Sequence, residues 1–268
     1  MSSASAIRHQ IESALAHKAP SALTPAPKII RPVTATGVTP LDDLLRGGLP
    51  EGAISELVGP ECSGRTSTAL SFLAGITQAG KVCAWIDVSN AFDPISAAAV
   101  GIDLARLLWV RCGVSQKNVP RTLNTFSSST RKPWTRIEEA LRVADQLLQS
   151  GGFSAVVLDM GGIEPEFVSR ISLATWFRYR AAAERTRSSV LLLTQYACAK
   201  SSAELLLQFQ PGGVLCDEAT VFTGMELHAE VVRRRFAEAQ SNVVPMRKPP
   251  QNVNAANWQS RIPWAGCR

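Results

Sequence analysis

The sequence has few charged residues and no apolar run long enough to cross a membrane. Asp, Glu, Lys and Arg together make up 19% of its 268 residues, whereas hydrophobic residues make up 46%. A charged fraction below the usual quarter, with this much apolar content, excludes wholesale disorder. A spanning helix needs about 20 consecutive apolar residues, and the first residues lack the charged-then-apolar order of a secretory signal. We therefore expect a soluble cytoplasmic protein with no membrane partner.

Metal-binding and disulfide patterns are also absent. The sequence has six cysteines and three histidines, but it has no C-x-x-C pair and no histidine at ligand spacing from a cysteine. These spacings exclude a recognisable zinc motif and argue against a disulfide framework. We expect buried, reduced thiols, at the scattered positions Cys62, Cys83, Cys112, Cys198, Cys216 and Cys267.

Composition divides the chain into three parts, and no internal repeat is present. Residues 1–36 combine an amphipathic helix over 1–19, with Ile7, Ile11 and Leu15 on one face, and a proline-rich linker. Such a helix buries its apolar face either against the core of the same chain or against a partner protein. Residues 37–238 have the sequence pattern of a globular core. Residues 239–268 form a basic tail rich in Pro and Asn, which we expect to be mobile over much of its length.

The core alternates apolar strand-length runs with helical patterns. Strands that are apolar on both faces and are separated by helices predict an α/β fold, with a mostly parallel central sheet flanked by helices. The expected strands are 54–58, 82–86, 107–110, 155–158 and 190–193, followed by antiparallel edge strands at 219–222 and 227–233. The expected helices are 67–79, 94–100, 134–149, 166–185 and 202–209.

The segment 59–67 carries the strongest motif. Its spacing is G-x-x-x-x-G-[basic]-[ST], directly after an expected strand and before an expected helix, which is the P-loop pattern in its required context. Backbone N–H groups and the helix dipole would cradle a polyphosphate there. The candidate nucleotide-binding residues are Gly59, Pro60, Glu61, Cys62, Ser63, Gly64, Arg65, Thr66 and Ser67.

Two residues would complete a magnesium site, and one departs from the pattern. Thr66 supplies a hydroxyl for Mg²⁺, and Asp159 ends the apolar run 155–158, where a carboxylate can hold a Mg²⁺-bound water. Arg65 replaces the usual lysine with a broader, flat guanidinium. This favours retained nucleotide binding with poor hydrolysis; the alternative is a loop kept only as a fold element.

Four blocks in the same order resemble the nucleotide-binding core of bacterial RecA recombinases. They are 40–52, 56–61, 80–87 and 91–94, and the close resemblance spans about 37–110 and becomes loose through residue 236. The resemblance implies a RecA-type P-loop NTPase core with ATP and Mg²⁺ as cofactors. It also implies that Asp93 lies near the adenine and that Gln195 senses the γ-phosphate.

The departures from RecA point to a shortened relative. Ser89 stands where the family places the glutamate that activates water, so general-base catalysis worth about 10²–10⁴ in rate would be missing. The segments 160–165 and 196–201, which match the family's DNA-binding loops, are brief. A short chain with curtailed loops is similar to the ImuA family, RecA relatives encoded beside a Y-family polymerase homologue in bacterial damage-induced mutagenesis.

A basic stretch suggests contact with single-stranded DNA. The net charge is +6, and no acidic residue lies between Asp103 and Glu138, where Phe126 and Trp134 accompany the cations. Cations beside aromatic residues suit phosphate contacts and base stacking, although a solvated loop explains them equally well. The candidate DNA-binding residues are Arg111, Lys117, Arg121, Arg131 and Lys132, and further cations of the stretch are Arg106 and Arg136.

Other features suggest protein partners. By the resemblance, Arg233 and Arg235 match residues that reach a neighbouring subunit's ATP; alternatively they protect an edge strand. Residues 1–19 with these arginines would support a homo-oligomer. Trp258 and Trp264 in the tail either fold back onto the sheet or anchor a partner. We expect Arg178, Arg180, Arg185 and Arg187 to line the exposed face of one helix.

The resulting hypothesis is a RecA-like ATP-binding accessory protein of DNA repair. It would act in SOS damage-induced translesion mutagenesis, weak or inactive as an ATPase, through contacts with a Y-family polymerase-like protein or RecA. One alternative is an active DNA-dependent ATPase or recombinase. Another is a regulator of cell division or signalling without DNA binding, because a fold alone does not decide function.

Overall fold

The computed structural model describes residues 7, 31–113, 133–216, 222–235 and 254–261. The chain divides into two compact units, 1–30 and 31–268. The first unit is described at Ile7 alone, so the amphipathic helix expected over 1–19 lies outside the described residues. All the elements given below belong to the second unit.

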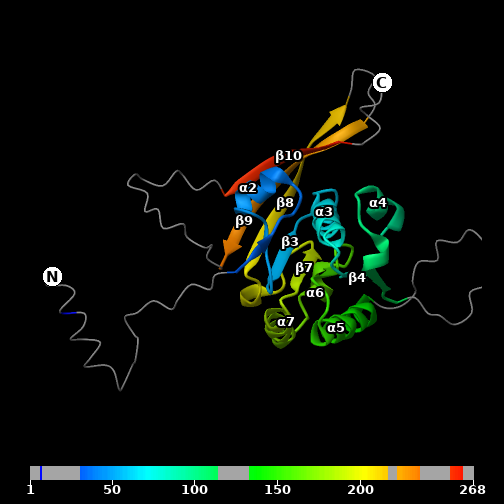
Figure 1. Cartoon of the computed structure of the whole chain (residues 1–268), viewed down its shortest axis with the longest axis vertical. Helices are drawn as coiled ribbons and strands as arrows, with labels where there is room; N and C mark the ends of the chain where they lie inside the picture. Colours follow the sequence, from blue (N-terminus) through cyan, green and yellow to red (C-terminus); the bar gives the residue numbers. More distant parts are fainter. Residues whose placement is uncertain (1–6, 8–30, 114–132, 217–221, 236–253, 262–268) are drawn as a thin grey trace, which may run out of the picture. The chain divides into compact units, whose positions relative to one another are not determined.

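An eight-stranded sheet forms the centre of this unit (Figure 1). Its strand order is β10-β9-β8-β3-β7-β6-β4-β5, in which the strands from β8 to β5 run parallel and β9 and β10 are antiparallel to their neighbours. The strands are β3 (Ile54–Val58), β4 (Cys83–Asp87), β5 (Leu107–Arg111), β6 (Ala155–Asp159), β7 (Ser189–Thr194), β8 (Leu205–Cys216), β9 (Phe222–Arg234) and β10 (Ala255–Arg261). A small separate pair joins β1 (Val33–Thr34) to β2 (Leu49–Pro50).

Helices cover both faces of the sheet, as expected from strands that are buried on both sides. One face packs on α2 (Thr39–Leu45), α3 (Arg65–Gln78) and α4 (Pro94–Ala99). The other packs on α5 (Pro133–Ser150), α6 (Pro165–Val168) and α7 (Leu173–Thr186). Short 3₁₀ turns, η1 (Leu104–Arg106) and η2 (Lys200–Ser202), complete the connections. The predicted fold class, with a mostly parallel sheet and antiparallel strands toward the C-terminus, is confirmed.

Most predicted elements are confirmed with boundaries shifted by one or two residues. The exceptions have local causes. The helix expected over 166–185 is two helices, because Ser172 caps α7 with its side chain accepting from the Thr175 N–H. The helix expected over 202–209 is wrong, since these residues end η2 and begin β8. Leu205, Leu206 and Leu207 are all buried between neighbouring strands, and a run without alternation does not separate a buried strand from a helix.

The C-terminal strands also differ from the expectation of edge strands and a mobile tail. β9 lies between β8 and β10, so it is an interior strand, and β10 is the edge. β10 pairs with β9 from Ala255↔Glu230 to Arg261↔Gly224. Trp258 packs edge-on against Phe209 at 6.1 Å between ring centroids, which confirms the fold-back interpretation for this residue. Trp264 and residues 219–221 lie outside the described residues.

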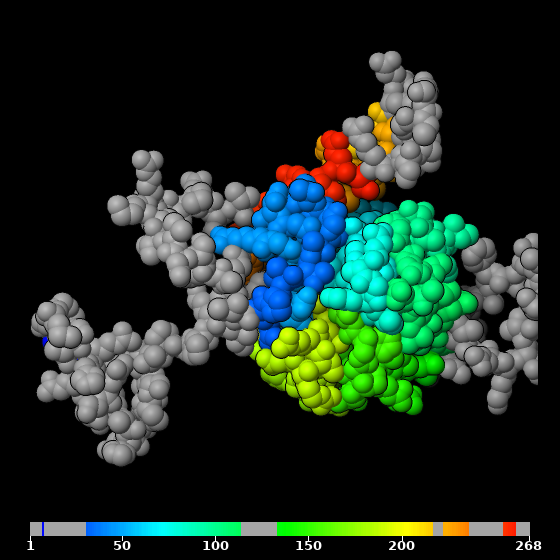
Figure 2. All heavy atoms as spheres, in the orientation of Figure 1, coloured from blue at the N-terminus to red at the C-terminus, as the bar shows by residue number. Residues whose placement is uncertain are grey.

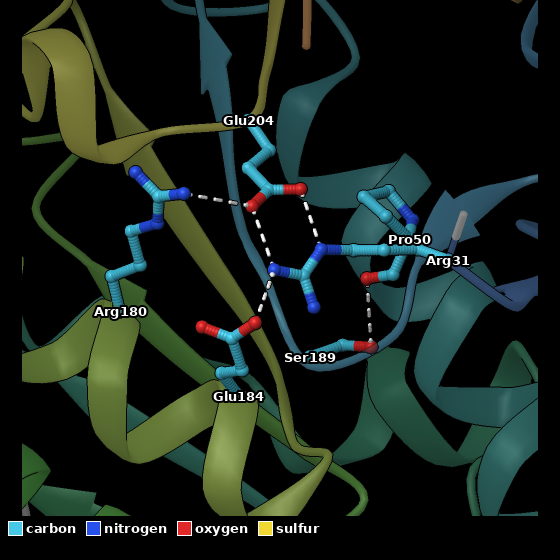
Figure 3. A network of polar contacts seen from close by, with 6 residues as sticks. All are labelled: Arg31, Pro50, Arg180, Glu184, Ser189 and Glu204. Atoms are coloured by element: carbon cyan, nitrogen blue, oxygen red, sulfur yellow. Dashed lines mark hydrogen bonds and ion pairs between the residues drawn. The ribbon is translucent and has the colours of Figure 1, made fainter. Parts of the chain in front are cut away.

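At the amino ends of the strands, an ion-pair network joins residue 31 to the core (Figure 3). Arg31 donates to both carboxylate oxygens of Glu204, at 2.6 and 2.8 Å, and to Glu184 at 3.2 Å. Arg180 approaches Glu204 at 3.4 Å. Arg31 and Glu204 are almost completely buried.

Of the arginines expected on the exposed face of α7, Arg178, Arg185 and Arg187 are exposed and Arg180 is half-buried, so the prediction is confirmed for three of the four. Arg180 points to Glu204, Arg178 to Asp145 on α5, and Arg185 to Gln149 on α5. Arg187 ends α7 in the left-handed region. Three of the four arginines thus join α7 to its neighbours. Among the helices that the structure describes, none has the length and apolar content to cross a membrane.

Candidate nucleotide site

The phosphate loop connects the carboxyl end of β3 to the amino end of α3. Gly59 leaves the strand so close to β8 that a Cβ there would lie 2.5 Å from the Phe209 carbonyl oxygen. Cys62 and Gly64 have φ of 58° and 91°, and these left-handed conformations turn the loop into the helix. The strand, loop and helix predicted from the motif are therefore in place, with the first residue of α3 at Arg65.

A cavity of about 1200 Å³ opens beside this loop. Its walls come from the loop, the start of α2, the helix α4 and the strands β9 and β10. Leu227 of β9 packs so close to Gly64 that a Cβ there would lie 2.7 Å from its Cδ1. In Figure 2, α2 in blue lies between the red residues of β10 and the cyan residues of α3. The sheet's C-terminal strands thus form one wall of the candidate site, which the motif did not indicate.

Three buried hydroxyl groups at or next to the loop have no hydrogen-bond partner among the residues that the structure describes. They are Ser63 Oγ in the loop, Thr68 Oγ1 in the first turn of α3 and Thr194 Oγ1 at the end of β7. Buried polar groups are normally paired, so an unpaired cluster calls for an explanation such as an absent ligand. Together with free N–H groups at the start of a 14-residue helix, these donors fit a polyphosphate.

Arg65 points into the protein. Its side chain is 6% exposed, and its Nη1 donates a hydrogen bond to the carbonyl oxygen of Thr194. A Cβ added at Gly161 would lie 3.3 Å from Arg65 Nη2 and 3.2 Å from Asp159 Oδ1, so the guanidinium and the carboxylate flank the same residue. Burial lowers the pKa of Arg65, while the charges of Asp159 and Glu61 raise it.

Asp159 and Gln195 meet at the turn after β6. Asp159 is 6% exposed and accepts a hydrogen bond from the Gly161 N–H at 3.0 Å. Burial raises the pKa of Asp159 to about 6, against the lowering effects of that hydrogen bond and of Arg65. Gln195 Nε2 donates to the Gly161 carbonyl at 3.1 Å. Two predicted site residues from different strands are therefore joined through one turn.

These residues fit a divalent cation poorly. A Mg²⁺ site needs oxygen ligands around an accessible position, but the Asp159 carboxylate is buried and has a guanidinium as its neighbour. Thr66 lies at the exposed start of α3. Within the described ranges, no group of three or more His, Cys, Asp or Glu side chains could hold a metal ion. A site made of the Thr66 hydroxyl, one carboxylate, water and phosphate oxygens needs no such group, so the predicted Mg²⁺ site stays a prediction. The buried Asp159 beside Arg65 is the observation against it.

Ser89 occupies the predicted position after β4 and serves as an acceptor. Its Oγ accepts the Gly162 N–H at 3.1 Å. The nearest carboxylate along the chain is Asp87, which is fully buried and accepts from the N–H groups of Ala91 and Phe92 and from the Trp109 indole. Asp87 therefore stabilises the turn after β4 and does not face the cavity.

Asp93 lies next to the cavity rather than in its wall. Its carboxylate caps α4 by accepting from the N–H groups of Ile95 and Ser96. The hydrogen bond from the Ser96 hydroxyl, together with those from the two N–H groups, lowers the pKa of Asp93. Ser96 itself lines the cavity. Asp93 therefore lies beside the part of the cavity where the resemblance to RecA places the adenine.

Three described cations of the basic stretch have partners within the chain. Arg106 donates to the Gly80 carbonyl at 2.8 Å and lies 3.1 Å from the carboxylate of Asp103. Arg111 is exposed, donates to Asn90 Oδ1 at 2.8 Å and stacks over Trp109 at 5.1 Å from the ring centroid. Arg136 donates to the Val88 carbonyl. The remaining candidates for DNA contact, Lys117, Arg121, Arg131 and Lys132, lie outside the described residues.

The two arginines expected to act on a neighbouring subunit have partners within this chain. Arg233 lies 3.5 Å from Glu56, a fully buried residue of β3. Arg235 donates to the Ser201 carbonyl at 2.9 Å. β10 pairs with β9 only as far as Glu230, so the alternative that these arginines protect an edge strand stays a prediction. Arg233 neutralises a buried carboxylate.

The cysteines follow the expectation in part. Cys83, Cys112 and Cys198 are buried free thiols whose pKa is raised chiefly by burial, to about 12 for the first two. Cys62 and Cys216 are exposed, against the expectation, and Cys267 lies outside the described residues. Cys62 is exposed because it occupies the turn of the phosphate loop.

Sequence reasoning missed the residues that come from the C-terminal strands. Leu227, Met225 and Trp258 line the cavity but lie far from the motif along the chain. Thr194 was also missed as the acceptor of Arg65. The sequence signal for these residues was Trp258, a large aromatic side chain in a segment rich in Pro and Asn.

Comparison with known proteins agrees with this geometry. The family model of the RecA N-terminal domain matches residues 4–120. Protein RecA of Nostoc sp. (strain PCC 7120) is 33% identical over 153 residues, which are 57% of this chain and 37% of that protein. Protein RecA of Crocosphaera subtropica is 37% identical over 125 residues, 47% of this chain and 30% of that protein. The matched region is thus well under half the length of these relatives.

Proposed function

Because this chain belongs to the RecA-like recombinase superfamily, we propose that it is a nucleotide-binding accessory protein of DNA repair with weak or no ATP hydrolysis. In this proposal the nucleotide state changes the conformation of the site, and the protein acts through contacts with other proteins and single-stranded DNA. A switch of this kind needs only different affinities for two states, not turnover.

Nucleotide binding is supported by the phosphate loop and its surroundings. The unpaired hydroxyl of Ser63, the N-terminal N–H groups of α3 and the adjoining cavity of about 1200 Å³ are what a nucleoside polyphosphate needs. When bound, ATP would supply charged phosphates to these donors. This cluster of unpaired donors is the observation that carries the proposal.

Weak hydrolysis is supported by the residue after β4. A general base must accept a proton from water, and the hydroxyl of Ser89 has no such capacity near neutral pH. It already accepts the Gly162 N–H, and the nearby Asp87 is enclosed by its own hydrogen bonds. The inward Arg65 removes a second contributor, because its Nη1 is bound to the Thr194 carbonyl.

The finer role is an ImuA-type function in SOS damage-induced translesion synthesis. The shortness of the segments 160–165 and 196–201 supports it, since α6 begins at Pro165 and η2 at Lys200. Partners of this role are a Y-family polymerase-like protein or RecA. Arg111, exposed and stacked on Trp109, is the described residue best suited to a nucleic acid phosphate.

The test is ATP hydrolysis by the purified full-length protein, with and without single-stranded DNA. We expect no DNA-stimulated turnover. We expect the double variant Ser89→Glu with Arg65→Lys to raise the hydrolysis rate at least tenfold, because the glutamate supplies a general base next to the lysine of the usual motif. The matched control is Ser89→Gln with Arg65→Lys, which has the same size but no base, and should stay at the wild-type rate. Robust DNA-stimulated hydrolysis by the wild type would instead establish an active ATPase or recombinase.

A further inference from the structure

Arg65 lines the phosphate-loop cavity, but its side chain is buried and bound to the sheet. It is the first residue of α3, yet its guanidinium is bound to the Thr194 carbonyl at the end of β7 and is 6% exposed. A basic residue in this position of the loop is expected to reach the terminal phosphates. In this structure its guanidinium is held in the cavity wall by the Thr194 carbonyl, beside Gly161.

The same charge lies beside the carboxylate that a metal would need. Asp159 Oδ1 and Arg65 Nη2 flank Gly161 at 3.2 and 3.3 Å from the position of an added Cβ. One oxygen of Asp159 already accepts the Gly161 N–H. A divalent cation at this carboxylate would therefore stand close to a fixed positive charge and would be repelled by it.

The unpaired donors are on the loop side of this arrangement. Ser63 Oγ is buried without a partner, and the start of α3 offers free N–H groups. Neither kind of donor needs a metal ion to bind phosphate, since N–H groups and hydroxyls donate directly to anionic oxygens. The charge that a metal ordinarily supplies is present as the buried guanidinium.

From this geometry we infer that the loop binds nucleoside di- or triphosphate without a divalent cation, with Arg65 taking the place of the metal's charge beside Asp159. The inference rests on the proposed nucleotide-binding function and deepens it. It also accounts for Arg65 in place of lysine: a guanidinium can donate to Thr194 and still present a second nitrogen toward Gly161.

The test is a titration of the full-length protein with fluorescent mant-ADP and mant-ATP, in excess Mg²⁺ and in excess EDTA. We expect the two dissociation constants for each nucleotide to agree within about threefold. Binding that is at least tenfold weaker in EDTA would overturn the inference while leaving the proposed nucleotide binding intact. Absence of binding in both conditions would overturn both.

A variant pair sharpens the result. Arg65→Lys removes the fork that reaches Thr194 and Gly161, so we expect the ratio of the dissociation constants in EDTA and Mg²⁺ to rise at least fivefold. Arg106→Lys is the matched control, because Arg106 also donates to a backbone carbonyl, that of Gly80, but on the exposed edge. Its ratio should equal the wild-type ratio. An unchanged ratio in folded Arg65→Lys, verified by circular dichroism, would contradict the assigned role of the guanidinium; should that variant not fold, the wild-type titration decides the inference alone.

Discussion

The amino ends and the carboxyl ends of the parallel strands, here called the amino edge and the carboxyl edge of the sheet, differ in what surrounds their buried polar groups. At the amino ends of β3, β7 and β8, Arg31 is held by both oxygens of Glu204 and by Glu184 (Figure 3). At the carboxyl ends, Ser63 and Thr194 have buried hydroxyls without partners in the described part of the chain. Paired buried groups are explained by the fold itself, whereas an unpaired buried group calls for another explanation, such as a ligand that binds to it.

Unpaired buried groups also occur at the amino ends, at Ser202 Oγ and Arg233 Nε, but Ser63 at the carboxyl ends lines the phosphate-loop cavity. The buried ion pair therefore indicates a structural role for the amino edge, and the unpaired hydroxyl in the cavity indicates ligand binding at the carboxyl edge.

The largest expected effect is at the amino edge. Glu204→Ala removes the buried carboxylate from the almost fully buried Arg31 and leaves the half-exposed Glu184 as its ion-pair partner among the described residues. Removing one member of a buried ion pair costs about 3–5 kcal/mol, and we expect this loss in the free energy of unfolding measured in urea. Glu184→Ala is the matched control, because its side chain is 52% exposed, and it should cost under about 1 kcal/mol. Equal losses in the two variants would show that the edge is not held by the Arg31–Glu204 pair.

The second prediction concerns the geometry of the phosphate loop. In Gly59→Ala the new methyl group would lie 2.5 Å from the Phe209 carbonyl oxygen, which is backbone and has no rotamer to adopt. We expect a loss of about 2–3 kcal/mol in unfolding free energy and at least a tenfold weaker affinity for mant-ATP. The control is Gly75→Ala, an exposed position in α3 with nothing within 4 Å of the added Cβ.

Gly75→Ala should increase stability by about 0.5–1 kcal/mol, because alanine has a higher helix propensity. If Gly59→Ala is as stable as this control and retains affinity, the close approach of the loop to β8 does not determine the site.

The third prediction follows from the raised pKa of Asp159. Its pKa is about 6 in the folded chain, against an ordinary 3.8, so the folded state binds more protons than the unfolded state between these values. The stabilisation from a protonated Asp159 is therefore present at low pH and is lost as the pH rises through about 6, by on the order of 3 kcal/mol. Asp159→Asn should flatten this part of the curve of unfolding free energy against pH. Parallel curves for wild type and variant between pH 4 and 7 would contradict the role of burial at Asp159.

The sequence predicted the parallel part of the fold because each strand there has its own apolar run and is followed by its own helix. It failed at β8, where Leu205–Leu207 is compatible with a helix and the strand exists because β3 and β9 pair with it. β10 has little strand propensity in its Asn and Gln residues and forms through pairing with β9.

The candidate site divides in the same way. The loop from Gly59 to Ser67 is encoded locally by spacing, so it could be predicted. The inward direction of Arg65 depends on the Thr194 carbonyl, and the wall of Leu227 and Trp258 depends on long-range pairing, so neither follows from the motif.

The smallest expected effect tests the carboxyl edge most directly. Ser63→Ala deletes a buried hydroxyl that has no partner in the described structure. A group that only served the fold would destabilise the protein when removed, but removal of an unpaired hydroxyl should leave the unfolding free energy unchanged or raise it by up to about 1 kcal/mol. If the hydroxyl serves a phosphate, the affinity for mant-ATP should fall about tenfold, which is about 1.4 kcal/mol. Opposite signs of the two effects identify a ligand-binding group; a loss of stability with unchanged affinity would place Ser63 with the structural edge instead.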